Sequence, residues 1–302
     1  MPLPSTIPPG WRPDLARWQQ LVPPARLAAL LAAAPHWRLF EVGCGGAAQF
    51  CAGHIPGAGY LDTNDMERAP LWNKVPDAEL LQLLLRHGVR HDSSVVLYGR
   101  NPLAAARAAQ LMLYAGVADV RLLDGGLAAW RGAGGALATG APRRYRAAAA
   151  FGAPFPARPD YLIDAARVRQ LLRQPDAALV SIRTWREFTG QTSGYGYIDA
   201  RGDIPGARWG RAGAGDDINS MSEFHDAAGR MLPAEAIGAL WRGAGVHAGQ
   251  QAAFYCGTGW RASLAFYYAW LMGWPRISVY DGGWCEWSSD PANPVVRRAA
   301  PP

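Results

Sequence analysis

The sequence predicts an α/β protein built from two tandem copies of one domain, each a parallel sheet flanked by helices. Three observations support this prediction: an internal repeat, short apolar runs that alternate with helical patterns, and a length of 302 residues. A chain of this length exceeds one domain of ~100–200 residues and fits two. Hydrophobic residues make up 50% of the chain and charged residues 18%, which indicates folded cores rather than disorder.

The repeat is clearest around two Asp-Gly-Gly turns. Three segments of the first half match three of the second half: Gly53–Ala58 with Gly202–Ala207, Leu97–Gly99 with Phe254–Cys256, and Leu123–Trp130 with Tyr280–Trp287. The last two pairs share one offset along the chain, which indicates a duplication without gaps in this part. The first pair has a shorter offset. The second copy therefore contains extra residues, and the polar, Gly-rich stretch 211–230 is the expected place for them.

Short buried strands alternate with helices in both halves. The expected strands are Arg38–Val42, Ser94–Tyr98 and Val120–Leu123, then Ala178–Ile182, Gln251–Tyr255 and Ile277–Tyr280. The expected helices are Ala78–His87, Ala104–Tyr114, Ala234–Arg242 and Ala262–Trp270. This alternation is typical of a parallel sheet covered on both faces.

Charge and composition exclude several classes of partner. The net charge is +6, but the arginines are scattered along the chain and form no basic stripe, so we expect no nucleic-acid partner. A preference for small anionic substrates is compatible with this charge. The apolar stretch 27–35 is too short to span a bilayer and lacks the pattern of a secretory signal, so we expect no membrane association and a cytoplasmic location.

The four cysteines form no CxxC pair and no spacing typical of zinc ligands, so neither a disulfide framework nor a metal site is expected. One reactive thiol is the better interpretation, and Cys256 is the candidate. We expect the other three, Cys44, Cys51 and Cys285, to be packed thiols.

Cys256 lies in a segment that reads as strand, glycine-rich loop and helix start. A loop at a helix N-terminus presents unpaired N–H groups and partial positive charge, which together favour a thiolate. Gly257 and Gly259 allow a tight turn, and Arg261 adds a fixed positive charge. The pattern therefore predicts a cradle for an anionic sulfur species.

These motifs resemble those of the tandem rhodanese family. The resemblance rests on Cys-Gly-Thr-Gly-Trp-Arg at 256–261, Asp-Gly-Gly-Trp at 281–284 and Gly-x-Ile-Pro-Gly-Ala upstream, and it covers nearly the whole chain. The loop is similar to that of the thiosulfate sulfurtransferase branch, whereas the mercaptopyruvate branch typically has Cys-Gly-Ser-Gly-Val. The resemblance implies a ping-pong cycle in which Cys256 takes sulfur from thiosulfate as a persulfide and passes it to an acceptor.

The resemblance also implies roles for the loop. Backbone N–H groups from Gly257 to Arg261, including those of Thr258, Gly259 and Trp260, would stabilise the persulfide, and Arg261 would neutralise the donor's sulfonate. Thr258 would add a hydroxyl donor. Trp260 would either shape the pocket rim or pack at a domain contact. No metal or organic cofactor is required.

The sequence departs from the family pattern in two places. Family members commonly have Asp-x-Arg after the first strand of a repeat, but the second copy has Ser181-Ile182-Arg183. Arg183 is thus either a substrate-binding residue that steers anions or a local partner of Asp203 or Glu187. The first copy has Gly99 where the second has Cys256, so it lacks a sulfur carrier.

These observations give the expected organisation of the chain. We expect an N-terminal extension at 1–22, an inactive rhodanese-like domain at 23–140, a linker at 141–159 and a catalytic rhodanese domain at 160–302. The expected partners are a small anionic sulfur donor and a thiol or cyanide acceptor, with a protein thiol also open.

Three other functions stay open at this point. A 3-mercaptopyruvate sulfurtransferase would use the same Cys256 with another donor. A non-catalytic rhodanese-like scaffold would have no need of an intact Cys256 loop. A cysteine phosphatase is disfavoured, because its arginine stands at the sixth position after the cysteine and Arg261 stands at the fifth.

Overall fold

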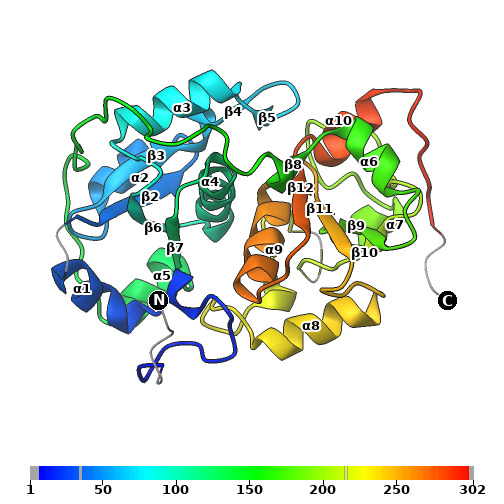
Figure 1. The fold of residues 1–302 in the computed structure, drawn as a ribbon. Coiled ribbons are helices and arrows are strands. Elements are labelled where there is room, and N and C mark those ends of the chain that lie inside the picture. Colours follow the sequence, from blue (N-terminus) through cyan, green and yellow to red (C-terminus); the bar gives the residue numbers. More distant parts are fainter. Residues whose placement is uncertain (1–6, 34–35, 214, 216, 299–302) are drawn as a thin grey trace.

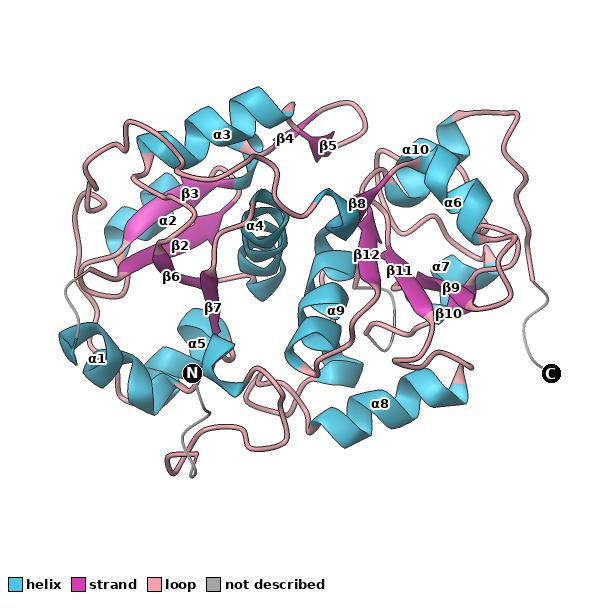
Figure 2. Cartoon of the chain, in the orientation of Figure 1, coloured by secondary structure: helices cyan, strands magenta, loops and turns pink. Residues whose placement is uncertain are grey.

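The computed structural model describes residues 7–33, 36–213, 215 and 217–298. It contains two sheets that lie in separate halves of the molecule, with helices on both sides of each (Figure 1). Figure 2 shows that the strands of each half form one layer between helices. The predicted fold class, two α/β domains with parallel sheets, is confirmed.

The first sheet has the strand order β1-β7-β6-β2-β3, and all of its pairings are parallel. Its strands are β1 (Leu21–Val22), β2 (Arg38–Gly43), β3 (Gly59–Asp62), β6 (Ser94–Tyr98) and β7 (Asp119–Leu123). Its helices are α1 (Pro24–Ala33), α2 (Ala47–Ala52), α3 (Asp77–Arg86), α4 (Pro102–Ala115) and α5 (Gly126–Gly132). β6 occupies the centre of the sheet, so the loop that follows it lies at the middle of the strand ends.

The second sheet repeats this arrangement with the order β10-β9-β11-β12-β8, again entirely parallel. Its strands are β8 (Leu162–Ile163), β9 (Ala177–Ser181), β10 (Arg208–Trp209), β11 (Gln251–Tyr255) and β12 (Ile277–Tyr280). Its helices are α6 (Ala165–Leu171), α7 (Trp185–Thr189), α8 (Ala234–Gly243), α9 (Trp260–Leu271) and α10 (Gly283–Ser289). β11 is the counterpart of β6.

The helices α4 and α9 lie side by side between the two sheets (Figure 1). Almost every residue of both helices is buried, because each helix packs on its own sheet and on the other helix. The two helices start directly after the loops that follow β6 and β11. The two loops of the duplicated domain therefore both open toward the domain interface.

Two further segments connect the halves. The short antiparallel hairpin of β4 (Glu67–Arg68) and β5 (Asn73–Lys74) extends from the first domain toward the second (Figure 2). The N-terminal segment also crosses over, since Arg17 donates backbone and side-chain hydrogen bonds to the end of α9. No helix among the residues described here is both long and apolar enough to cross a membrane.

Candidate active site

Cys256 lies where the central strand of the second sheet ends. β11 is buried and ends at Tyr255, and α9 begins at Trp260. The strand, loop and helix order agrees with the sequence interpretation. Because neighbouring parallel strands end at the same edge, the residue that follows a central strand is surrounded by other strand ends, where α/β proteins commonly bind ligands.

The sulfur of Cys256 faces the start of α9. The backbone N–H of Gly259 donates to Sγ over 3.2 Å. Gly259 itself has a φ of +102°, a left-handed conformation that suits glycine. The first N–H groups of a helix have no acceptor within the helix, and the helix dipole adds partial positive charge there. The arrangement therefore suits a sulfur atom that carries negative charge.

The loop is closed from two sides. The N–H of Gly257 donates to the hydroxyl of Tyr195 over 3.2 Å, so it is occupied and does not face the sulfur as we expected. A Cβ atom on Gly257 would lie 2.1 Å from the ring of Tyr195, which requires glycine here. At the start of α10, the N–H of Trp284 donates to the carbonyl of Cys256 over 2.8 Å. These contacts fix the backbone on either side of the sulfur.

Arg261 is held by an acid that the sequence interpretation did not include in the site. Its guanidinium donates to both carboxylate oxygens of Glu187, at 2.8 and 2.9 Å, and to the hydroxyl of Tyr195 at 2.7 Å. Burial disfavours ionised Glu187, but Arg261 and Arg183 together lower its pKa to about 2. The fork of Arg261 is thus already occupied. Arg261 lines the pocket, and its hydrogen bonds in this structure go to Glu187 and Tyr195; its contact with the donor's sulfonate stays a prediction.

Arg183 is also engaged locally. Its side chain is fully buried, and its guanidinium lies 3.2 Å from Asp203 and 3.5 Å from Glu187. It does not line the pocket in front of Cys256. The structure therefore favours the local ion pair over the substrate-binding role that we also considered for Arg183. The physical reason is burial, since a guanidinium enclosed by two carboxylates cannot steer a solvated anion.

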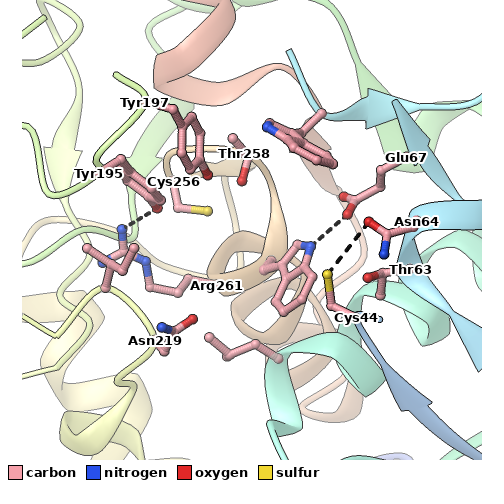
Figure 3. A pocket seen from close by; sticks show the side chains of 14 residues that line it. Cys44, Thr63, Asn64, Glu67, Tyr195, Tyr197, Asn219, Cys256, Thr258 and Arg261 are labelled. Carbon is pink, nitrogen blue, oxygen red and sulfur yellow. Dashed lines mark hydrogen bonds between the residues drawn. The ribbon is translucent and has the colours of Figure 1, made fainter. Parts of the chain in front are cut away.

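A pocket of about 250 Å³ opens in front of Cys256 and is lined by both domains (Figure 3). The first domain contributes six residues, namely Cys44, Thr63, Asn64, Glu67, Trp72 and Leu103. From the second domain, Tyr195, Tyr197 and Thr258 surround the sulfur (Figure 3). Ile218 and Asn219 belong to the stretch 211–230 that we interpreted as an insertion in the second copy. The site is thus a shared cavity of the two domains.

Trp260 serves both functions that the sequence left open. It lines the pocket, and its indole Nε1 donates to Oε2 of Glu67 in the first domain over 2.7 Å. Glu67 also accepts from Arg107 at 2.7 Å, and Arg107 reaches Asp281 at 2.5 Å. Burial raises the pKa of Glu67, although Arg107 counteracts this shift. A buried ionic cluster therefore joins the two domains directly behind the pocket wall.

The tyrosines form an aromatic wall above the sulfur. The ring of Tyr197 lies 5.5 Å from that of Tyr195 and 6.4 Å from that of Trp72, measured between centroids. Burial raises the pKa of the Tyr197 hydroxyl, and the nearby Thr258 side chain counteracts this shift. Thr258 lines the pocket beside Tyr197 and Cys256, and its role as a hydroxyl donor stays a prediction.

The corresponding loop of the first domain is built differently. A Cβ atom on Gly99 would lie 2.4 Å from the carbonyl oxygen of Asn101, so the loop is too tight for a cysteine at this position. Arg100 occupies the place of Gly257 and binds Glu41 at 2.9 Å. The helix then starts with Pro102, which has no N–H to offer.

The other cysteines differ from expectation in part. Cys285 is buried, as expected of a packed thiol. Cys44 and Cys51 are exposed, so the prediction that they are packed was wrong. The error arises because both lie where the first domain has short loops and a short helix, α2, rather than core strands. Cys44 lines the pocket, and its thiol lies 3.7 Å from Oδ1 of Asn64.

The comparison with protein families decides what these two domains are. The rhodanese-like domain family matches the chain twice, at residues 24–133 and 164–290. The chain is a tandem member of the rhodanese-like family. The resemblance inferred from the motifs is thereby confirmed.

Several relatives of this rhodanese chain have names that describe a sulfurtransferase. Thiosulfate sulfurtransferase YnjE of Escherichia coli is 53% identical over 86% of this chain and 59% of its own length. A crystal structure of YnjE superposes with a TM-score of 0.91 at 49% identity, covering 95% of this chain and 70% of that one. A probable 3-mercaptopyruvate sulfurtransferase of Pseudomonas aeruginosa is 38% identical over 83% of this chain and 87% of its own. The chain thus matches less than two thirds of the full-length YnjE sequence.

A third relative binds a different kind of molecule. The anaerobic ergothioneine biosynthesis enzyme of Chlorobium limicola, solved with its natural substrate trimethyl histidine, has a TM-score of 0.90 at 36% identity. The comparison covers 95% of this chain and 72% of that one. Similar solved structures of the protein EanB include one with a cysteine persulfide.

Sequence reasoning missed the part of the site that comes from the first domain. A motif search around Cys256 cannot find Glu67 or Trp72, because they belong to a hairpin in the other copy. The clue available was the segment Tyr195-Gly196-Tyr197, an aromatic pair in a polar loop. It carries no known motif, and only the fold brings it to the sulfur.

Proposed function

We propose that this chain is a thiosulfate sulfurtransferase that carries sulfane sulfur on Cys256 as a persulfide. The observation that supports this most directly is the contact of Cys256 Sγ with the Gly259 N–H at the start of α9, inside a pocket. The name of the E. coli relative supports the choice of thiosulfate.

The proposed first half-reaction transfers one sulfur atom. The Cys256 thiolate attacks the outer sulfur of thiosulfate, the S–S bond of thiosulfate breaks, and sulfite leaves with the bonding electron pair. The product is a Cys256 persulfide anion. It is stabilised by N–H donors at the start of α9, Gly259 among them, in a water-poor setting where such donors are most effective.

The proposed second half-reaction regenerates the thiolate. A nucleophile such as a thiolate or cyanide attacks the terminal sulfur, and the Cys256 thiolate leaves. The loop holds the negative charge of both protein species, since the persulfide and the released Cys256 thiolate each carry it on sulfur. Arg261 contributes indirectly, because its contact with Tyr195 holds the ring that closes the loop at Gly257.

One observation favours a second candidate acceptor. Solved structures of EanB include variants at a tyrosine 59 residues before, and at a threonine two residues after, the cysteine that carries the persulfide. Tyr197 and Thr258 stand at the same separations from Cys256. We therefore propose as the alternative that the persulfide sulfurates an imidazole ring like that of trimethyl histidine. In that case the Tyr197–Thr258 hydroxyl pair would contact the ring.

The experiment that tests the donor is a stoichiometric single turnover. The protein is mixed with thiosulfate, or separately with 3-mercaptopyruvate, without an acceptor, and released sulfite or pyruvate is measured. The proposal predicts one sulfite per protein with thiosulfate at a much higher rate than pyruvate from mercaptopyruvate. Faster pyruvate release would favour the mercaptopyruvate alternative, and no release from either donor would favour a non-catalytic scaffold. To test the imidazole candidate, trimethyl histidine is added to the loaded protein. Formation of the thione of trimethyl histidine is then measured by mass spectrometry.

Two further assignments complete the proposal. We retain the division into 1–22, 23–140, 141–159 and 160–302, with catalysis confined to the last part. We also propose a cytoplasmic location, supported by the absence of a disulfide among the four cysteines, all of which the structure describes.

A further inference from the structure

We infer that the pocket selects a sulfur acceptor that carries a positive charge, and that the inactive domain provides this selectivity through Glu67 and Trp72. The inference rests on the proposed sulfurtransferase function of Cys256. It adds to that function a chemical class of acceptor and a role for the domain that lacks a sulfur carrier.

The hairpin of the inactive domain is fixed against the catalytic domain. The N–H of Lys74 donates to Asp281 over 2.8 Å, and the amide of Asn73 reaches Glu286 at 3.4 Å. Trp72, in the hairpin's turn, has a φ of +59°. This conformation is unusual for a bulky residue, and such residues cluster at ligand sites. The backbone N–H of Trp72 donates to the carbonyl oxygen of Arg68. The ring of Trp72 lies against the ring of Tyr197 inside the pocket.

The carboxylate of Glu67 gives this wall a negative charge. Glu67 lines the pocket next to Trp260, whose indole it binds (Figure 3). Its ionic partner Arg107 is shared with Asp281. One guanidinium therefore faces two carboxylates, which leaves the three groups with an excess of negative charge. Both oxygens of Glu67 already accept hydrogen bonds, from Arg107 and from Trp260, so Glu67 acts on the pocket through its charge.

The opposite wall offers no compensating cation. Arg261 is the only basic residue among those described that line the pocket, and both oxygens of Glu187 bind it. Behind it, Arg183 is balanced by Asp203. Two arginines thus face two acids, and an anionic acceptor finds no open partner on this side.

The remaining surface of the pocket is aromatic. Trp72, Trp260, Tyr195 and Tyr197 all line it. Aromatic faces attract ammonium groups, and aromatic cages are the usual means of binding quaternary ammonium ions. A carboxylate joined to aromatic rings therefore favours a cation. Thiosulfate is small and delivers its outer sulfur to the α9 end of the pocket, so we expect charge selection mainly in the second half-reaction.

The test compares three thiols of similar size on protein already loaded with sulfur: cysteamine, 2-mercaptoethanol and 2-mercaptoethanesulfonate. They are cationic, neutral and anionic, respectively. Loss of the persulfide is followed by mass spectrometry, and rates are expressed per thiolate. We expect cysteamine to react at least tenfold faster than the sulfonate. Relative to the rate of the neutral thiol, Glu67→Gln should reduce the cysteamine rate at least fivefold and raise the rate of the sulfonate.

Two variants separate recognition from loosening of the interface. Asp281→Asn removes the other carboxylate that binds Arg107, but Asp281 does not line the pocket, so the ratio of the cysteamine rate to the sulfonate rate should fall by clearly less than in Glu67→Gln. Trp72→Leu should lower the cysteamine rate relative to the rate of the neutral thiol. Equal rates for the three thiols, or the same change of ratio in Asp281→Asn as in Glu67→Gln, would overturn the inference. Loading a parallel sample with inorganic polysulfide keeps this result independent of whether thiosulfate is the donor.

Discussion

The two domains have the same sheet topology and differ in the loop after the central strand. In the second domain, Cys256 is followed by glycines, and the N–H of Gly259 points at the sulfur. In the first, Gly99 is followed by Arg100, which closes the loop through Glu41. The fold alone therefore does not create the site. The difference lies in a few residues that place a backbone N–H group at the sulfur atom of Cys256.

The comparison also shows what the first domain retained. Both Asp-Gly-Gly turns send their aspartate across the interface: Asp281 binds Arg107 and the N–H of Lys74, and Asp124 binds the N–H of Met231. The duplicated turn thus became a contact between the copies. The loss of the cysteine left a domain that shapes the pocket of its neighbour.

The largest effect is expected at the two equivalent positions Cys256 and Gly99. Cys256→Ser should reduce sulfur transfer to the background rate, because serine cannot form a persulfide. Adding Gly99→Cys to this variant should restore nothing, since a Cβ there meets the carbonyl of Asn101 at 2.4 Å and α4 begins with a proline. Sulfite release from thiosulfate measures both. Recovery of turnover in the double variant would show that the first loop can form a cradle after all.

The next effect concerns Glu187 and Glu41, the acids that bind Arg261 and Arg100 of the two equivalent loops. Glu187→Gln leaves Arg183 and Arg261 buried without their shared acid, which should cost about 3–5 kcal/mol of unfolding free energy. Glu41→Gln should cost only about 1 kcal/mol, because its partner Arg100 is partly exposed to solvent. Urea unfolding of the two variants measures the difference. Similar costs would mean that the buried cluster under Cys256 has no special part in stability.

Glu187 also predicts a dependence on pH. Its folded pKa of about 2 lies below the ordinary value of about 4.3, so its contribution is present above pH ~4.3 and is lost as the pH falls toward 2. A shift of this size corresponds to about 3 kcal/mol. The unfolding free energy of Glu187→Gln should lack this part of the acid-induced decrease. Parallel pH profiles for the variant and the unmodified protein would contradict the assignment.

The smallest effects should have opposite signs at the two Asp-Gly-Gly turns. Asp281→Asn should destabilise by about 1–2 kcal/mol, since a buried pair with Arg107 is lost while Glu67 still holds that arginine. Burial raises the pKa of Asp124 to about 6, so its contribution to stability is full below pH ~4 and decreases as the pH rises through 6. Asp124→Asn should therefore stabilise by about 1–2 kcal/mol at pH 7 and have little effect at pH 4. Thermal unfolding at both pH values checks this, and a loss of stability at pH 7 would contradict it.

The sequence was sufficient for the fold and for the position of Cys256 between a buried strand and a helix. The duplication, the central strands and the strand–loop–helix around Cys256 follow from local patterns, because they depend on hydrophobic periodicity and on glycines near in sequence. The acidic partners of the arginines do not follow from local patterns. Arg261 has the pattern of an anion ligand, and only the packing of α7 against α9 shows that Glu187 occupies its fork. Trp72 and Glu67 enter the pocket through the domain interface, which no local pattern in either copy describes.

The claim that Cys256 alone carries the sulfur is tested most directly by peptide-resolved mass spectrometry after exposure to thiosulfate. The protein is loaded, excess donor is removed, free thiols and persulfides are alkylated, and the four cysteine-containing sites are compared. We predict one additional sulfur on the peptide of Cys256 and none on those of Cys44, Cys51 and Cys285, although Cys44 and Cys51 are the more exposed thiols. Additional sulfur on Cys44, Cys51 or Cys285, or none on Cys256, would contradict the account.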